Sequence, residues 1–173
     1  MGYPTAEMEP LLESVSSLLV DTASTLSIAE STSGGLISAA LLSLNGASKW
    51  YRGGAVLYTL EARSEFAGWT EEDTRNYRGP TEDVASTLAV NVREKLNSTY
   101  TIGEAGVAGP HSLVRSLPPG LTCISIARED GPPVTKTIMT GSRDRALNMQ
   151  AFAEESLKLL RDVLLAKKEG HKL

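Results

Sequence analysis

Short apolar segments alternate along this chain with longer segments in which apolar residues recur at helical spacing, and this alternation limits the possible folds most strongly. Strands are predicted at residues 25–29, 53–58, 101–107, 121–127 and 134–139. Helices are predicted at residues 9–24, 34–44, 61–67 and 81–96, with a further helix start at Thr70 and a final helix after Ser142. A turn at residues 129–133 joins the last two strands, which we therefore expect to pair antiparallel. The pattern predicts a layered α/β domain with some antiparallel pairing.

The length and composition of the chain predict one domain. The chain has 173 residues, and a domain takes about 150 residues. Aromatic residues make up only 5% of the sequence, so aliphatic side chains and alanine must fill most of the core, as in helices packed on a sheet. We expect a single domain over residues 1–173, with short flexible tails at about residues 1–8 and 166–173.

Charge and cysteine content exclude several classes of protein. The net charge is −4, so the basic surface typical of nucleic-acid-binding proteins is missing. Cys123 is the single cysteine and the chain has two histidines, which argues against a disulfide framework and a structural metal site. No apolar run reaches about 18 residues, the length of a membrane-spanning helix. We therefore expect a cytoplasmic protein with no nucleic-acid or membrane partner, no metal and no other cofactor.

Residues 29–35 place three hydroxyl groups and two glycines between a predicted strand and a predicted helix. Ligands of open α/β sheets bind in the crevice at such strand ends. Gly34 and Gly35 allow the backbone to approach a ligand closely, and we expect unpaired N–H groups at the helix start to face the crevice. Ser31 is therefore a candidate nucleophile. The alternative is that these hydroxyl groups only cap the helix.

Two further strand ends carry candidate residues. Tyr58 ends the second predicted strand and Arg63 lies inside the next helix, so the pair could bind an anionic or carboxamide-bearing ligand. The alternative is a half-buried strand tyrosine and a surface arginine. The third strand ends in a glycine-rich segment that includes Gly106, Ala108 and Gly109. Such a segment suits backbone contacts with phosphate, or is an ordinary tight turn that opens the loop at residues 108–120.

Taken together and in order, these segments resemble the CinA C-terminal domain family, represented by bacterial nicotinamide mononucleotide deamidase. The segment Ala29-Glu30-Ser31-x-Ser33-Gly34-Gly35 is similar to the family signature Ala-Glu-Ser-x-Thr-Gly-Gly. Further blocks that resemble those of the family are Gly46-Ala47-Ser48, Arg52-Gly53-Gly54 with Tyr58, Ala108-Gly109-Pro110, Pro119-Gly120 and Gly141-Ser142-Arg143. The resemblance covers roughly Leu11 to Leu165 and implies a three-layer α/β/α sandwich with a mixed sheet.

The resemblance also implies an activity, which is hydrolysis of the carboxamide of nicotinamide mononucleotide to nicotinate mononucleotide and ammonia. Ser31 would attack the amide carbon, Tyr58 would assist, and a lysine, replaced here by Arg63, would accept the proton. The residues expected to bind substrate are Glu30, Ser33, Gly34, Gly35, Gly106, Ala108 and Gly109. No metal or cofactor is implied, and family members commonly form dimers or larger homo-oligomers.

Arg63 leaves two functions open. Arginine stays protonated at any working pH, so it cannot act as the general base. Either the chain is still an amidohydrolase in which Tyr58, His111, Glu30 or water takes the proton, or it is a catalytically silent homologue that binds a pyridine nucleotide or another phosphate ligand. The family's inward arginine is also missing near Leu147. The retention of Ser31 and Tyr58 slightly favours the amidohydrolase.

Overall fold

The computed structural model describes residues 2–112 and 116–170, so residues 113–115 of the predicted loop lie outside the described part of the chain. A mixed sheet forms its centre. The strands are β1 (Leu26–Glu30), β2 (Tyr51–Val56), β3 (Tyr100–Val107), β4 (Leu121–Arg128) and β5 (Gly131–Met139). Their order is β2-β1-β3-β4-β5, with β1 parallel to β2 and β3, and with β4 antiparallel to β3 and β5. The predicted antiparallel pairing of the last two strands is confirmed.

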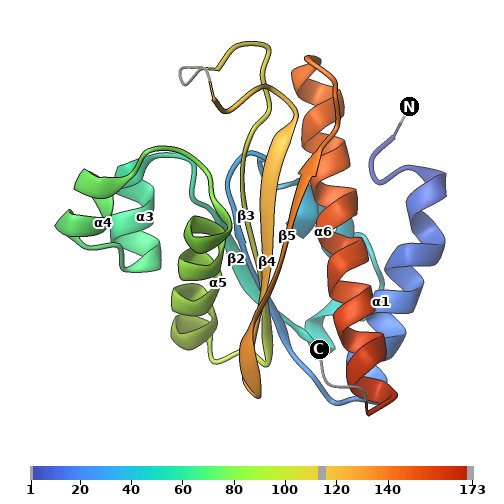
Figure 1. Ribbon diagram of the computed structural model, residues 1–173. Helices are drawn as coiled ribbons and strands as arrows, with labels where there is room; N and C mark the ends of the chain where they lie inside the picture. The colour runs from blue at the N-terminus through green and yellow to red at the C-terminus, as the bar shows by residue number, and fades with distance from the viewer. Residues whose placement is uncertain (1, 113–115, 171–173) are drawn as a thin grey trace.

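Helices cover both faces of the sheet and complete the predicted three-layer α/β/α sandwich (Figure 1). One face carries α1 (Glu9–Asp21), α2 (Leu36–Leu42) and α6 (Arg145–Lys168). The other face carries α5 (Glu82–Leu96), and α3 (Leu60–Ala67) with α4 (Glu71–Asn76) extends beside it. Two short 3₁₀ helices, Ala6–Met8 and Ala47–Lys49, complete the described elements.

Two strands, β2 and β5, differ from the prediction by more than one residue. β2 begins at Tyr51 rather than at Gly53 and ends at Val56, because its pairing with β1 begins between Leu26 and Tyr51. Tyr58 therefore follows the strand instead of ending it. β5 begins at Gly131 and includes the two prolines that were placed in the turn. Proline fits there because β5 is an edge strand, where a missing N–H breaks no ladder on the open side.

Aliphatic side chains fill the larger core, as the low aromatic content predicts. It lies between the sheet and the layer of α1, α2 and α6, and Met8 from the predicted N-terminal tail is part of it. On the other face β3 and α5 approach closely at Gly103, where an added Cβ would lie 2.1 Å from the Ala85 carbonyl oxygen. Only a glycine permits this contact, which fixes the distance between the sheet and α5.

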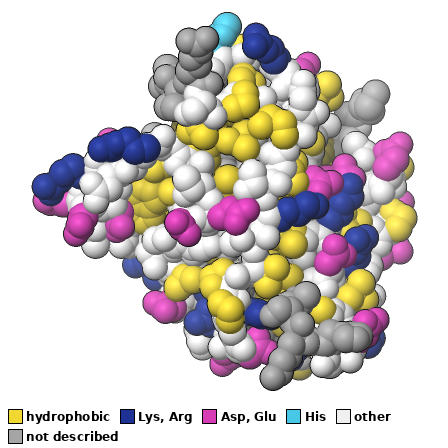
Figure 2. Space-filling model, viewed as in Figure 1, with side chains coloured by type: hydrophobic (Ala, Val, Ile, Leu, Met, Phe, Trp, Pro, Cys, Tyr) yellow, Lys and Arg dark blue, Asp and Glu magenta, His cyan; other side chains and the backbone are white. Residues whose placement is uncertain are grey.

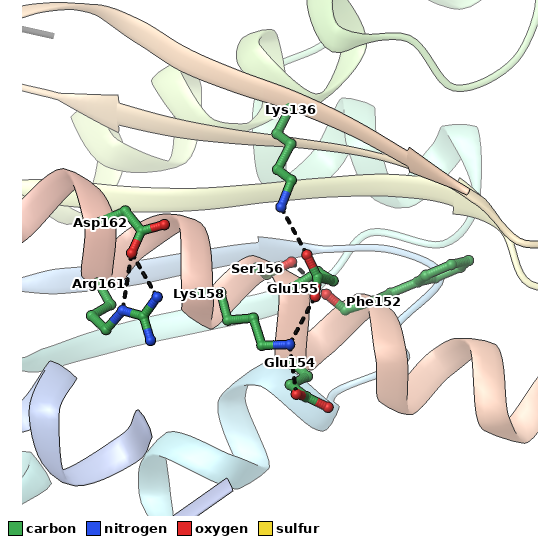
Figure 3. A network of polar contacts seen from close by, with 8 residues as sticks. All are labelled: Lys136, Phe152, Glu154, Glu155, Ser156, Lys158, Arg161 and Asp162. Atoms are coloured by element: carbon green, nitrogen blue, oxygen red, sulfur yellow. Dashed lines mark hydrogen bonds and ion pairs between the residues drawn. The ribbon is translucent and has the colours of Figure 1, made fainter. Parts of the chain in front are cut away.

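Ion pairs connect the outer side of α6 with the edge of the sheet (Figure 3). Lys136 of β5 contacts Glu155 at 2.8 Å, and Lys158 contacts Glu154 at 2.8 Å and Glu155 at 2.9 Å. Because these side chains are partly exposed to solvent, each pair contributes at most about 1 kcal/mol to stability. The core, rather than this network, holds α6 on the sheet.

The surface carries charges of both signs. On the face drawn in Figure 2, acidic and basic side chains are interspersed, with hydrophobic side chains exposed between them. Within residues 2–112 and 116–170, no helix is long and apolar enough to cross a membrane. The same described residues contain no cluster of three or more His, Cys, Asp or Glu that could hold a metal ion.

Candidate functional site

A cavity of about 720 Å³ lies at the carboxyl ends of the parallel strands. Its inner end contains Ser31 and Arg63, which are 2% and 3% exposed. Its rim contains the exposed side chains of Tyr58, Arg78, His111 and Arg145. The remaining described lining residues are Thr32, Tyr77, Gly79, Pro80, Gly106, Val107, Ala108, Gly109, Ser112, Ser116 and Leu117.

The turn that carries Ser31 is held by Glu104, a fully buried carboxylate of β3. Glu104 Oε2 accepts hydrogen bonds from the backbone N–H groups of Ser31 and Ser33 at 3.0 and 2.9 Å. The hydroxyl groups of Thr32 and Thr122 donate to Oε1 of the same carboxylate. Sequence analysis missed Glu104, although a single carboxylate within an otherwise apolar predicted strand was a usable signal. Glu104 therefore fixes the position of Ser31 from the buried side of the turn, opposite the cavity.

Glu30 holds the start of α2 and does not line the cavity. Its carboxylate accepts hydrogen bonds from the N–H groups of Gly35, Ile37 and Ser38 at 2.9 to 3.1 Å. A carboxylate at a helix N-terminus is favoured by the partial positive charge of the free N–H groups. The expectation that unpaired N–H groups of this helix start face the crevice is therefore wrong for Gly35, Ile37 and Ser38, whose N–H groups are bonded to Glu30.

Ser33 connects these two carboxylates. Its hydroxyl lies 2.8 Å from Glu30 Oε2 and 3.0 Å from Glu104 Oε2. Ser33, Gly34 and Gly35 shape the turn, and Gly34 and Gly35 both have positive φ angles of 67° and 97°. None of the three is among the described residues that line the cavity.

Arg63 is buried and reaches Ser31, which differs from the alternative of a surface arginine. Its Nε donates to the Leu57 carbonyl at 3.2 Å, and Nη2 donates to Ser31 Oγ at 3.4 Å, a long hydrogen bond. The guanidinium lies 4.9 Å from the ring centre of Trp69 and 4.7 Å from that of Tyr77. Nη1 is buried and has no hydrogen-bond partner among the described residues.

Tyr58 is exposed at the rim of the cavity. Its hydroxyl accepts a hydrogen bond from Arg145 Nη2 at 3.2 Å, while Arg145 Nη1 donates to the Gly109 carbonyl at 2.8 Å. Arg145, which sequence analysis did not single out, thus connects the start of α6 to the segment that carries Tyr58 and to the glycine-rich segment at Gly109. The hydroxyl of Tyr58 is engaged with Arg145 rather than with Ser31.

The glycine-rich wall is fixed by Asn148, a buried residue of α6 that sequence analysis also missed. Its Nδ2 donates to the carbonyls of Ala108 at 2.8 Å and Ser142 at 3.0 Å. Gly109 has a φ of 97°, and an added Cβ would lie 3.0 Å from the Arg143 carbonyl oxygen. Close packing therefore requires glycine at this position, whether or not a phosphate binds there.

The cavity brings together six of the predicted site residues, namely Ser31, Tyr58, Arg63, Gly106, Ala108 and Gly109. It does not include Glu30, Ser33, Gly34 or Gly35. Among the described lining residues, none is Asp or Glu, whereas three are arginines. The cavity is therefore suited to an anionic ligand.

A comparison with protein families matches residues 8–164 to the model of the CinA C-terminal domain. A "CinA-like protein" of Chloroherpeton thalassium is 33% identical over 167 residues, which cover 95% of this chain and 39% of that protein. Another, from Desulforapulum autotrophicum, is 34% identical over 155 residues, which cover 88% of this chain and 36% of that protein. The chain thus spans less than two fifths of the length of these relatives.

Solved structures share the fold. The competence or damage-inducible protein from Enterobacter asburiae superimposes with a TM-score of 0.82 at 25% identity, covering 89% of this chain and 96% of that one. The competence/damage inducible protein CihA from Agrobacterium tumefaciens superimposes with a TM-score of 0.88 at 23% identity, covering 95% of this chain and 99% of that one.

Proposed function

The chain belongs to the CinA C-terminal domain family, and on that premise we propose that its cavity binds a pyridine mononucleotide such as nicotinamide mononucleotide. The observation that carries this proposal is the charge of the cavity, whose described lining holds Arg63, Arg78 and Arg145 and no carboxylate. The substituted ring would enter toward Ser31 and Arg63 at the inner end. The phosphate would bind between the arginines of the rim and the backbone of residues 106–109.

The surroundings of Ser31 favour binding without amide hydrolysis. Attack by Ser31 Oγ on the carboxamide carbon would form an ester and release ammonia, after which water would hydrolyse the ester to a carboxylate. The first step needs a base for the Ser31 proton. Among residues 2–112 and 116–170, the side chain that hydrogen-bonds to Ser31 Oγ is Arg63, which stays protonated. The two buried carboxylates, Glu30 and Glu104, are bonded to other groups.

Hydrolysis is the second candidate, and Thr32 favours it. Its backbone N–H, directly after Ser31, has no hydrogen-bond acceptor among the described residues, and Thr32 lines the cavity. This N–H and Arg63 could stabilise the oxyanion that forms when Ser31 attacks an amide. Loss of the base would still lower the rate by about 10²- to 10⁴-fold. The homo-oligomeric state, the single-domain organisation and the cytoplasmic location stay predictions.

Thermal unfolding with added nucleotide and an ammonia-release assay together test the proposal. We expect nicotinamide mononucleotide to raise the melting temperature of the wild-type protein, because a ligand that binds only the folded state stabilises it. Ammonia release should be at or near background in the wild type and should rise in Arg63→Lys, where a lysine can lose its proton. Arg161→Lys, on the outer side of α6 and paired with Asp162, is the matched control and should behave as wild type.

Two results would contradict the proposal, one on the ligand class and one on hydrolysis. If no pyridine nucleotide changes the melting temperature, the proposed ligand class is wrong. If wild-type protein releases ammonia at a rate that Ser31→Ala abolishes, the chain is an amidohydrolase and the second candidate replaces the first.

A further inference from the structure

The inner end of the cavity offers hydrogen-bond donors and a positive charge that the described residues do not satisfy. Arg63 is 3% exposed, lines the cavity and has a buried Nη1 without a partner among the described residues. No described carboxylate forms an ion pair with it. A buried cation without a counter-charge is unfavourable unless a ligand supplies one. The unpaired guanidinium therefore points to an anionic group on the ligand.

Two rings fix the orientation of this guanidinium. Its carbon lies 4.9 Å from the centre of Trp69 and 4.7 Å from that of Tyr77, while Nε is bonded to the Leu57 carbonyl. Because these contacts hold the planar group in one position, little side-chain freedom remains to be lost when a ligand binds. A planar guanidinium held in this way suits a planar partner with two acceptor oxygens.

Three carbonyl groups of the glycine-rich cavity wall already accept a hydrogen bond each. The carbonyl groups of Val107, Ala108 and Gly109 accept hydrogen bonds from Gly120, Asn148 and Arg145, respectively. A carboxamide brings an NH₂ group with two donors that need acceptors, whereas a carboxylate brings acceptors alone. The donors of Arg63 and the Thr32 N–H therefore match a carboxylate better than a carboxamide.

We propose that the inner end of the cavity binds a carboxylate in preference to the matching carboxamide, so that the preferred ligand is the acid form of a pyridine mononucleotide. This inference rests on the proposed function, which supplies the nucleotide. It adds that Arg63 determines specificity for the substituent of the pyridine ring, while the arginines of the rim bind the phosphate that both forms share.

Isothermal titration calorimetry with nicotinate mononucleotide and nicotinamide mononucleotide tests the inference, because the two probes differ only at the ring substituent. We expect wild-type protein to bind the acid at least about tenfold more tightly than the amide. In Arg63→Met the ratio should fall to within about twofold. This variant should fold, since an apolar side chain of similar length can replace a buried charge without loss of stability. Circular dichroism would check the fold.

Arg145→Gln is the matched control at the rim of the cavity. It should weaken the binding of both nucleotides to a similar extent and leave the ratio of their affinities unchanged. If wild-type protein binds both nucleotides with equal affinity, the carboxylate preference is refuted while the proposed nucleotide site stands. If neither nucleotide binds, the proposed function fails and the inference falls with it. Retention of the tenfold ratio in Arg63→Met would also overturn the role given to Arg63.

Discussion

At the scale of single residues, the local sequence pattern predicts the side chains that line the cavity better than it predicts the buried side chains that hold the cavity walls in place. Ser31 and Arg63 follow strand ends and could be found from sequence. Glu104 stands out in the sequence only as a carboxylate within an apolar strand, and the roles of Glu104 and Asn148 could not be derived because their partners are distant along the chain. Glu104 bonds to Ser31 across 73 positions and Asn148 to Ala108 across 40. Only the folded chain brings such partners together. The sequence predicts that Glu30 binds substrate, but its carboxylate binds the N–H groups at the start of α2 instead.

Replacing Glu104 with glutamine tests its role directly. Glu104→Gln puts an NH₂ group where only donors are present, so at least one buried hydrogen-bond group loses its partner. We expect the free energy of unfolding to fall by about 2–4 kcal/mol, measured by urea denaturation. Nucleotide binding should weaken as well, because the turn that carries Ser31 loses its support. Glu94→Gln, an exposed site on α5, should change stability by less than about 0.5 kcal/mol. A similarly small effect at Glu104 would contradict the assigned role.

At the scale of helices and strands, periodicity predicted each described strand and most helices, and the errors lie at the boundaries. Prolines at the start of β5 and glycines in β2 are typical of turns, yet the sheet accepts both because β2 and β5 are its edge strands. The order of the strands could not be derived from the pattern, since it depends on pairing between distant segments. Contact between β3 and α5 depends on one residue, Gly103.

Substitution of Gly103 should separate these two elements. In Gly103→Ala the new Cβ would lie 2.1 Å from the Ala85 carbonyl oxygen and 2.9 Å from the Ala89 Cβ, so α5 must shift from the sheet. We expect a loss of about 1–3 kcal/mol or more, seen as a melting temperature lower by at least about 2 °C. Gly2→Ala has no atom within 4 Å of the added Cβ and serves as control. Equal melting temperatures for the two variants would show that the close approach of β3 and α5 does not require glycine at position 103.

At the scale of the whole molecule, one buried and two half-buried tyrosines in different parts of the structure make stability depend on pH in the alkaline range. Burial raises the pKa of Tyr3, Tyr51 and Tyr100, and the charges of Glu30 and Glu154 raise the pKa of Tyr3 further. Tyr3 also donates a hydrogen bond to the Leu36 carbonyl. Each tyrosine is therefore bound to its proton more firmly in the folded chain than in the unfolded chain.

Stability should consequently decrease in alkaline solution. Above the ordinary tyrosine pKa of about 10, the unfolded chain loses protons that the folded chain keeps, so the free energy of unfolding falls as the pH rises. Each of these tyrosines contributes up to about 1.4 kcal/mol per pH unit. Urea denaturation at pH 8, 9, 10 and 10.5 would measure the slope. In the triple variant Tyr3→Phe, Tyr51→Phe, Tyr100→Phe the slope should be smaller, and an unchanged slope would refute the explanation.

The attachment of the Ser31 turn to Glu104 also has a consequence for the order of events during synthesis. When a ribosome has released β1 and α2, the chain already contains Ser31, but the carboxylate that fixes the turn is 73 positions further along. Arg145, at the rim of the cavity, emerges later still. A nascent chain therefore lacks the complete cavity until α6 begins to emerge, and the proposed nucleotide would stabilise only chains that have been synthesised past Arg145.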